Sequence, residues 1–406
     1  MDIVTAREAL QLPERTPASA RTVFRLLQQL RHGSLTISLP DGSVQTVGDG
    51  QGPHLSLHLH NWQPFKAALK SGDIGFAESY IAGDWTTSHL PDLLRLLAAN
   101  RQALDDVIHG SWIGRLAYRL RHLLNRNTRG NSRKNIHAHY DLGNDFYRLW
   151  LDGTMNYSSG LFQGNLQQDM QQAQHAKVRR ALHMAGVRRG HRVLEIGCGW
   201  GALAEKATQE FGAHLTGVTL STEQLAWAKA RLENKGLGQQ ADFRLQDYRD
   251  CDGQFDHIAS IEMFEAVGEE YWSTYFQAVN RLLKPGGRAA IQTITIDDAL
   301  FERYRKGTDF IQQYIFPGGM LPCPSKFRAL AEKHGLRVVS EKRFGKDYAE
   351  TLRRWRKTFM SQLDTVRKQG FDQPFINTWE FYLAYCEAGF EYESTDVFQF
   401  YLEKNR

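Results

Sequence analysis

Two strand-like segments and one helix-like segment stand out in the first quarter of the chain. Residues 34–39 and 54–59 alternate polar and apolar side chains, which is the pattern of strands with one buried face. Residues 90–104 place apolar side chains at helical spacing and predict an amphipathic helix. Together these segments predict a small α+β domain, to which we assign residues 1–115.

Short strand-like runs with apolar centres, separated by helical patterns, dominate the second half of the chain. They lie at residues 192–196, 214–220, 243–248, 255–261 and 288–294. Apolar strands that alternate with helices are typical of a doubly wound, mostly parallel sheet, whose ligand lies at the carboxyl ends of the strands. Residues 336–341 are also strand-like, and the tail from residue 348 is predicted to be largely helical.

A glycine-rich turn follows the first of these runs. Gly197, Gly199 and Gly201 stand at a spacing of two, directly before a segment of helical composition. Glycines here let a ligand lie against the backbone at the amino end of a helix. A tight turn without a ligand is the alternative. A nicotinamide dehydrogenase would more often have G-x-G-x-x-G and an acidic residue ending the second strand, whereas this strand ends at Thr219.

Composition narrows the classes of function. The chain has 406 residues, 42% of them hydrophobic, which suits two globular domains. Its four cysteines are scattered without a C-x-x-C motif, so neither a metal site nor a disulfide framework is expected, and a cytoplasmic location fits. No signal peptide and no apolar run long enough to span a bilayer is found. The formal net charge of +5 suits an anionic membrane surface or nucleic acid.

A basic segment joins the two predicted domains. Residues 107–140 contain no acidic residue, and arginines accumulate there beside tryptophan, isoleucine and leucine. Basic amphipathic helices lie on anionic bilayers, whereas a linker helix packed on its own domain is the alternative. We assign residues 116–135 to a basic linker and residues 136–406 to the catalytic domain.

Several motifs in order resemble the cyclopropane fatty acid synthase family, including the related mycolic acid methyltransferases. They are Gly75-Phe-Ala-Glu-Ser-Tyr80, His139-Tyr-Asp-Leu-Gly-Asn-Asp145, Gly197-Cys-Gly-Trp-Gly201, Met263-Phe-Glu-Ala-Val-Gly268 and Tyr314-Ile-Phe-Pro-Gly318. The resemblance covers nearly the whole chain. It implies a Rossmann-like S-adenosylmethionine-dependent methyltransferase domain, preceded by a lipid-engaging domain.

The family moves the methyl group of S-adenosylmethionine onto the double bond of an unsaturated acyl chain of a membrane phospholipid. The resemblance therefore implies an enzyme bound peripherally to the inner face of the membrane, at its anionic surface. It also implies a set of cofactor-binding residues, with Glu195 or Gln224 as candidates for ribose recognition because no acid ends the second strand. The set is Tyr157, Ser158, Glu195, Gly197, Gly199, Gly201, Thr219, Leu220, Gln224, Gln246, Asp247 and Tyr248.

Methyl transfer leaves a carbocation on the acyl chain, and a base must then remove a proton. In the synthase pattern a bicarbonate ion, held by a cysteine, a glutamate, a histidine and a tyrosine, is the presumed base. The resemblance places Glu265 and Tyr348 at two of these positions, and Ser159 and Gln292 at the cysteine and histidine positions. Bicarbonate use therefore stays open, as does the choice between a cyclopropane and a methyl- or methylene-branched product. Glu265 is a candidate for the base itself, with a purely structural carboxylate as the alternative.

The faces of aromatic rings stabilise cations. Several aromatic residues in or next to the family motifs are therefore candidates to line the acyl pocket. For each of them, packing in the core is the alternative. They are Tyr140, Tyr157, Phe264, Tyr314, Phe316 and Tyr348. Two other functions compete with the lipid methyltransferase: a methyltransferase of a soluble small metabolite, and a catalytically inactive lipid-binding protein. No nucleic-acid-binding motif is recognised, and a homodimer is left open.

Overall fold

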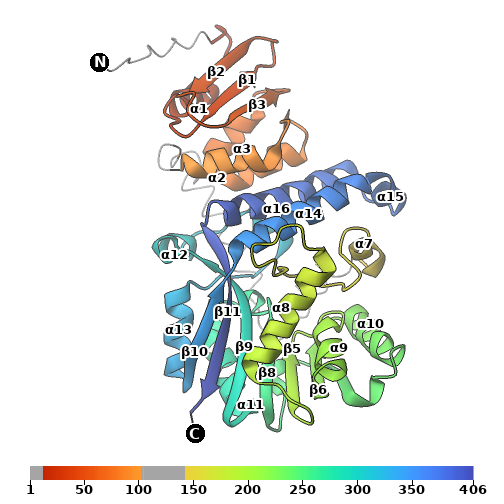
Figure 1. The fold of residues 1–406 in the computed structure, drawn as a ribbon. Helices are drawn as coiled ribbons and strands as arrows, with labels where there is room; N and C mark the ends of the chain where they lie inside the picture. Colours follow the sequence, from red (N-terminus) through yellow and green to blue (C-terminus); the bar gives the residue numbers. More distant parts are fainter. Residues whose placement is uncertain (1–11, 102–103, 105–141, 406) are drawn as a thin grey trace. The chain divides into compact units, whose positions relative to one another are not determined.

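The computed structural model describes residues 12–101, 104 and 142–405, which form two compact units (Figure 1). The predicted basic linker at 116–135 lies outside the described residues, and so do the predicted domain boundaries at 115 and 136. These assignments therefore stay predictions. Within the described residues, no helix is both long and apolar enough to cross a membrane.

The N-terminal unit is a four-stranded sheet with helices, in the order β2-β1-β3-β4. The two predicted strands are β1 (Ser34–Ser38) and β3 (His54–Leu59), which pair in parallel. Between them along the chain, β2 (Val44–Gly48) pairs antiparallel with β1, and Val47 is its only buried side chain, so that it lacks the pattern of a strand with one buried face. The remaining elements are α1 (Ala18–Leu27), α2 (Gln63–Ile81), β4 (Trp85–Thr86) and α3 (Leu90–Ala99).

The chain returns to this unit near its end, at Asp372–Ala388. This segment forms most of α16 (Gln373–Glu391), whose side chains meet α2 through hydrogen bonds. Tyr80 Oη donates to Glu380 Oε2 at 2.8 Å, and Tyr385 Oη donates to Asp73 Oδ2 at 2.9 Å. The sequence analysis had assigned the whole of residues 136–406 to one domain.

The second unit is a seven-stranded sheet in the order β10-β11-β9-β8-β5-β6-β7. The five strands from β9 to β7 run parallel, whereas β11 runs antiparallel to both of its neighbours. The strands are β5 (Arg192–Ile196), β6 (His214–Thr219), β7 (Ala241–Leu245), β8 (Phe255–Ile261), β9 (Leu283–Ile296), β10 (Leu336–Arg343) and β11 (Thr395–Lys404). The predicted fold class, a doubly wound and mostly parallel sheet, is confirmed.

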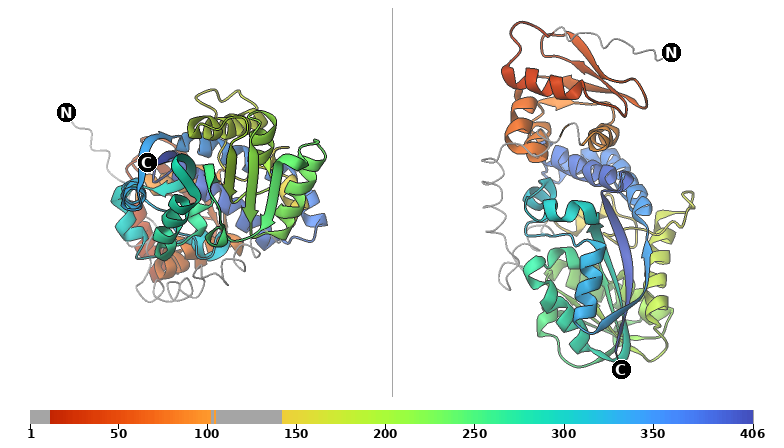
Figure 2. Two further views of the ribbon diagram at one scale, coloured as in Figure 1. Left: turned by 90° about the horizontal axis from the view of Figure 1, so that it is seen from below. Right: turned by 90° about the vertical axis from the view of Figure 1, so that its left-hand side faces the viewer.

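Helices cover both faces of this sheet (Figure 2). Alternate residues of each central strand point to opposite sides, so that Leu194 and Ile258 pack with α11 and α13 while Val193 and Ala259 pack with α8 and α9. The helices are α7 (Asn144–Arg148), α8 (Met170–Ala185), α9 (Ala202–Gln209), α10 (Thr222–Glu233), α11 (Trp272–Leu282), α12 (Asp298–Tyr304), α13 (Pro324–Lys333), α14 (Gly345–Ser361) and α15 (Leu363–Lys368). Short helical turns are η1 (Gly238–Gln240), η2 (Tyr248–Asp250), η3 (Phe264–Ala266), η4 (Glu269–Tyr271) and η5 (Ile311–Ile315).

The prediction that the tail from residue 348 is largely helical is confirmed by α14, α15 and α16. The sequence did not reveal that the tail ends in a strand, β11, which lies between β9 and β10. Val397, Phe400 and Leu402 are fully buried. A short apolar run of this kind does not distinguish a buried strand from a buried helix by its periodicity.

Candidate functional site

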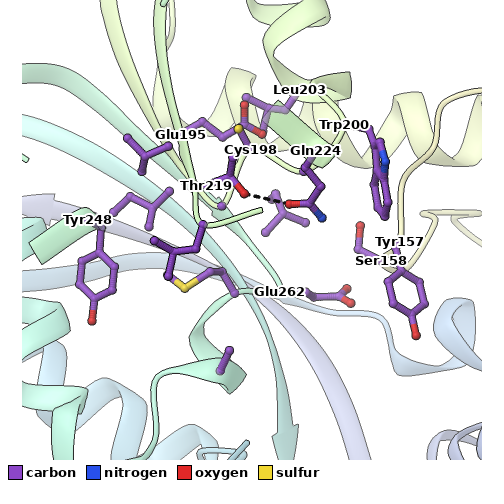
Figure 3. Close-up of a pocket in the computed structure, with 18 of the residues that line it drawn as sticks. Tyr157, Ser158, Glu195, Cys198, Trp200, Leu203, Thr219, Gln224, Tyr248 and Glu262 are labelled. Carbon is purple, nitrogen blue, oxygen red and sulfur yellow. Dashed lines mark hydrogen bonds between the residues drawn. The ribbon is translucent and has the colours of Figure 1, made fainter. Parts of the chain in front are cut away.

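A cavity opens at the carboxyl ends of β5, β6 and β8, where a doubly wound sheet binds its ligand (Figure 3). Its volume is about 170 Å³, whereas a single water molecule needs only roughly 10–15 Å³. All but one of the residues predicted to bind the cofactor line it. Those residues are Tyr157, Ser158, Glu195, Gly197, Gly199, Thr219, Leu220, Gln224, Gln246, Asp247 and Tyr248.

The glycine turn between β5 and α9 forms one wall of the cavity. Gly199 has a φ of +48°, and a Cβ added to it would meet no atom within 4 Å, so this residue leaves open space for a ligand. Gly201 is the predicted residue that does not line the cavity. A Cβ there would lie 3.1 Å from the Cβ of Ala228, which means that Gly201 allows α9 and α10 to pack closely.

Hydrogen bonds fix the polar side chains at the end of β6. Thr219 Oγ1 donates to Gln224 Oε1 at 2.9 Å and accepts from the Ser221 backbone N–H at 3.1 Å. Ser221 caps α10, because its hydroxyl accepts from the Gln224 N–H. The Gln224 side chain is therefore held at the cavity wall by the strand that precedes its own helix (Figure 3).

The cavity fits S-adenosylmethionine, the methyl donor expected from the sequence. Glu195 is buried at its wall, and Glu195 Oε2 has no hydrogen-bond partner among the described residues. A buried carboxylate oxygen of this kind calls for a donor, such as a ribose hydroxyl. The apolar wall beside it includes Ile196, Leu203 and Val218, which suit an adenine ring. Within the described residues, no group of acidic, histidine or cysteine side chains could hold a metal ion.

Three of the predicted catalytic residues meet at one carboxylate, and it belongs to Glu262. Glu262 Oε1 accepts from the Ser159 backbone N–H at 2.9 Å and from Gln292 Nε2 at 2.7 Å. Glu262 Oε2 accepts from Tyr348 Oη at 2.6 Å. Of this cluster, Glu262 lines the cavity, so its carboxylate stands at the space for the methyl donor (Figure 3).

Sequence analysis did not identify Glu262, although one signal pointed to it. The residue directly follows β8, a central apolar strand, and therefore stands at the sheet edge where ligands bind. Its backbone has a φ of +49°, which is unusual for a residue other than glycine, and its N–H donates to the Gln292 carbonyl at 2.8 Å. Backbone strain of this kind concentrates at functional sites.

A chain of buried amides orients Gln292. Tyr401 Oη donates to Gln399 Oε1 at 2.5 Å, and Gln399 Nε2 donates to Gln292 Oε1 at 2.8 Å. The oxygen of the Gln292 amide is thus occupied, and its nitrogen faces Glu262 as a donor. Ser159 contributes differently, because its hydroxyl donates to the Gly160 carbonyl and only its backbone N–H reaches the carboxylate.

Glu265, the predicted catalytic glutamate, lies one turn further along. Its Oε1 accepts from the Ile294 N–H, and none of Ser159, Gln292 and Tyr348 forms a hydrogen bond to it in the structure. Burial, and next the negative charge of Glu262, raise the pKa of Glu265 to about 8. The Glu265 carboxyl is therefore protonated at neutral pH.

Lys177 of α8 supplies the positive charge near Glu262. It is fully buried, and its Nζ donates to Ser158 Oγ at 2.5 Å and to Asn156 Oδ1 at 3.4 Å. Burial lowers the pKa of Lys177 to about 8, although the carboxylates of Glu262, Asp152 and Glu195 oppose this shift. Burial raises the pKa of Glu262, whereas the Lys177 charge and the three hydrogen bonds favour its ionised form.

Tyr157, which lines the cavity, and Tyr348, which belongs to the Glu262 cluster, both pack against other aromatic rings. The ring of Tyr157 lies 5.5 Å from that of Trp355 and 6.4 Å from that of Phe316, and Tyr348 stacks on Phe390 at 4.5 Å. Of the other aromatic candidates, Phe264 is buried in the core. Tyr314 is exposed, and Tyr140 lies outside the described residues.

The raised pKa of Glu265 gives a stability prediction. A folded-state pKa of about 8 against an ordinary value of 4.5 favours folding below pH 4.5, and this contribution is lost as the pH rises through 8. As the pH rises from 4.5 to 8, the free energy of unfolding of the wild type should therefore decrease relative to that of Glu265→Gln. Urea titrations at several pH values measure the difference. Glu332→Gln, at an exposed position of α13, is the control, because its free energy of unfolding should differ from that of the wild type by the same amount at every pH. A difference between the wild type and Glu265→Gln that also stays constant with pH would contradict the prediction.

Comparisons with known proteins identify the family of the chain. Residues 127–400 match the protein family described as mycolic acid cyclopropane synthetase. The chain is 40% identical over 398 residues to the tuberculostearic acid methyltransferase UfaA1 of Mycobacterium tuberculosis, covering 95% of this chain and 91% of that protein. It is 31% identical over 348 residues to the cyclopropane-fatty-acyl-phospholipid synthase of Escherichia coli, covering 84% and 86%.

A solved structure gives the same result for the fold. The mycolic acid cyclopropane synthase CmaA1, complexed with SAH and CTAB, superposes with a TM-score of 0.63 at 30% identity. The match covers 67% of this chain and 98% of that one. The chain belongs to the family of cyclopropane fatty acid synthases and mycolic acid methyltransferases, and it is an S-adenosylmethionine-dependent fatty acyl methyltransferase.

Proposed function

We propose that the protein methylates the double bond of an unsaturated acyl chain carried on a membrane phospholipid, and that the product is a methyl- or methylene-branched chain. The observation that carries the proposal is the Glu262 carboxylate, which lines the methyl-donor cavity and occupies the centre of the Ser159, Gln292 and Tyr348 cluster. S-adenosylmethionine supplies a methyl group already activated by its sulfonium charge. The residues of the chain must then position the alkene, keep out water and receive a proton.

Two similarities support the chemical class of the product and substrate. The relative with 40% identity is named a tuberculostearic acid methyltransferase, and tuberculostearic acid carries a methyl branch. The Escherichia coli relative is named for an acyl chain on phospholipid. Ser159 and Gln292 also stand where the sequence resemblance expects the cysteine and histidine that hold bicarbonate, so we propose that a separate anion is not used. The net charge of +5 suits peripheral binding to the anionic inner face of the membrane.

The two competing functions have less support. A catalytically inactive lipid-binding protein has no need for the open glycine turn, the oriented Gln292 amide and the buried Lys177 beside one carboxylate. A methyltransferase of soluble metabolites has no need for a domain like the N-terminal unit. Its expected ligand, moreover, would place polar groups beside the aromatic rings around Tyr157.

Lipid analysis of cells that express the protein tests this function. Phospholipids of a host with unsaturated acyl chains should gain one CH₂ unit per modified chain, and fragmentation should locate a methylene branch at the former double bond. Cells that express Gly199→Val are the control for activity of the host. A cyclopropane ring as the only product would overturn the proposed branch, and unmodified phospholipids beside a methylated soluble metabolite would overturn the substrate class.

A further inference from the structure

We propose that the Glu262 carboxylate is the base that removes the proton after methyl transfer, taking the place of a separate anion. This inference rests on the proposed function, because it assigns a step in that reaction to a residue. Glu262 is the carboxylate that both lines the methyl-donor cavity and receives the hydrogen bonds of Ser159, Gln292 and Tyr348.

The hydrogen bonds around Glu262 leave one oxygen ready for a proton. Glu262 Oε1 accepts two hydrogen bonds, from the Ser159 N–H and from Gln292 Nε2. Glu262 Oε2 accepts one hydrogen bond within the described part of the chain, from Tyr348 Oη. A carboxylate oxygen has two lone pairs, so Oε2 retains one with which to bind a proton.

The charges around Glu262 suit a base better than those around Glu265. Lys177 favours the ionised form of Glu262, while burial keeps its pKa above that of an ordinary carboxyl, which strengthens it as a proton acceptor. Glu265 holds its own proton at neutral pH because it is buried beside the Glu262 charge. It also lies outside the set of residues that line the cavity.

The step balances without another reactant. The methylated acyl chain carries one positive charge, on the alkene carbon next to the one that received the methyl group. A 1,2-hydride shift moves the charge to the methyl-bearing carbon, and a C–H bond of the new methyl group then breaks. Its electron pair forms the C=CH₂ double bond of the methylene branch, and the proton passes to Glu262 Oε2. Glu262 later releases the proton to water, which restores the carboxylate for the next turnover.

Glu262→Gln tests the base directly while preserving the cluster. The amide oxygen can accept from the Ser159 N–H and Gln292 Nε2, and its nitrogen can donate to Tyr348 Oη, because a phenol also accepts hydrogen bonds. Binding of S-adenosylmethionine should stay unchanged by calorimetry, whereas turnover on oleoyl phospholipid vesicles should fall by a factor of ~10²–10⁴. Removing carbon dioxide from the buffer should leave the wild-type rate unchanged.

Glu262→Gly provides a rescue experiment. Glycine adopts the φ of +49° freely, and the lost side chain leaves space among the same donors for a small anion. Turnover should fall as it does for Glu262→Gln, and added bicarbonate or acetate should restore part of it. Glu262→Gln should not respond to either anion, because its amide still fills the space.

A matched control exists at a second glutamate. Glu393 also has a positive φ, of 61°, but it is exposed and forms ion pairs with Arg343 and Lys346. Glu393→Gly should keep wild-type turnover with or without added anion.

The outcomes separate the inference from the proposed function. A wild type that methylates lipid but requires bicarbonate, or a Glu262→Gln variant with normal turnover, would overturn Glu262 as the base and leave the function standing. A loss of turnover in Glu262→Gly without anion rescue would show a structural role instead. A wild type that binds the methyl donor but never methylates an acyl chain would overturn both.

Discussion

Replacing Gly199 with valine is expected to lower the affinity for S-adenosylmethionine by at least about 100-fold, or about 2.8 kcal/mol. The reason is steric, because Gly199 lines the cavity at the end of β5 and a Cβ there would meet no protein atom within 4 Å. A branched side chain would occupy the space in which the ligand must approach the backbone of the turn. Isothermal titration calorimetry with the purified variant measures the affinity.

Backbone strain must be separated from this steric effect. Valine at a φ of +48° is strained by about 1–2 kcal/mol whether or not a ligand binds. Gly236→Val carries a comparable strain at a φ of +69°, also with no atom within 4 Å, but it lies outside the set of residues that line the cavity. This control should bind the methyl donor like the wild type. Equal affinities for all three proteins would mean that the glycine turn does not contact the ligand.

Replacing Lys177 with methionine is expected to lower the free energy of unfolding by about 3–5 kcal/mol, since removal of one partner leaves buried charge uncompensated. Lys177 is fully buried, and its charge acts on both Glu262 and Glu195. Methionine has a similar length but supplies neither the charge nor the hydrogen bond to Ser158 Oγ. Urea denaturation at neutral pH measures the loss.

A second substitution identifies the charge that Lys177 compensates. If the main partner is Glu262, the double variant Lys177→Met with Glu262→Gln should recover part of the lost stability, which a double-mutant cycle quantifies. Lys333→Met, at an exposed position of α13, should change the stability little. A loss for Lys177→Met as small as that of the Lys333 control would contradict the assigned role of Lys177.

The sequence predicted the sheet well where its pattern was unambiguous. The run at 192–196, the glycine turn after it and the alternation of strands with helices lead directly to β5, α9 and the neighbouring strands. β11 was missed, because an apolar run of this length is compatible with either a strand or a helix. β2 was missed because Val47 is its only buried side chain, so that it lacks the alternation of a half-buried strand.

The candidate site, too, was predictable from the sequence only in part. Residues at strand ends, such as Thr219 and Gln246, meet at one edge because parallel strands share their carboxyl ends. The partners of Glu262 could not be read from spacing, because Tyr348 and Ser159 are 86 and 103 positions away along the chain. Resemblance directed attention to Glu265, whereas the hydrogen bonds of Ser159, Gln292 and Tyr348 go to Glu262, the residue that we propose as the base.

The most direct test of the account follows the methyl group itself. The purified protein is incubated with methyl-labelled S-adenosylmethionine and vesicles of oleoyl phospholipid. Vesicles of stearoyl phospholipid are the matched saturated control. The acyl chains are then released and analysed by mass spectrometry. The account predicts that label appears at the former double bond of the oleoyl chains and is absent from the stearoyl chains. Label that never enters an acyl chain, although the protein binds both the methyl donor and the vesicles, would contradict it.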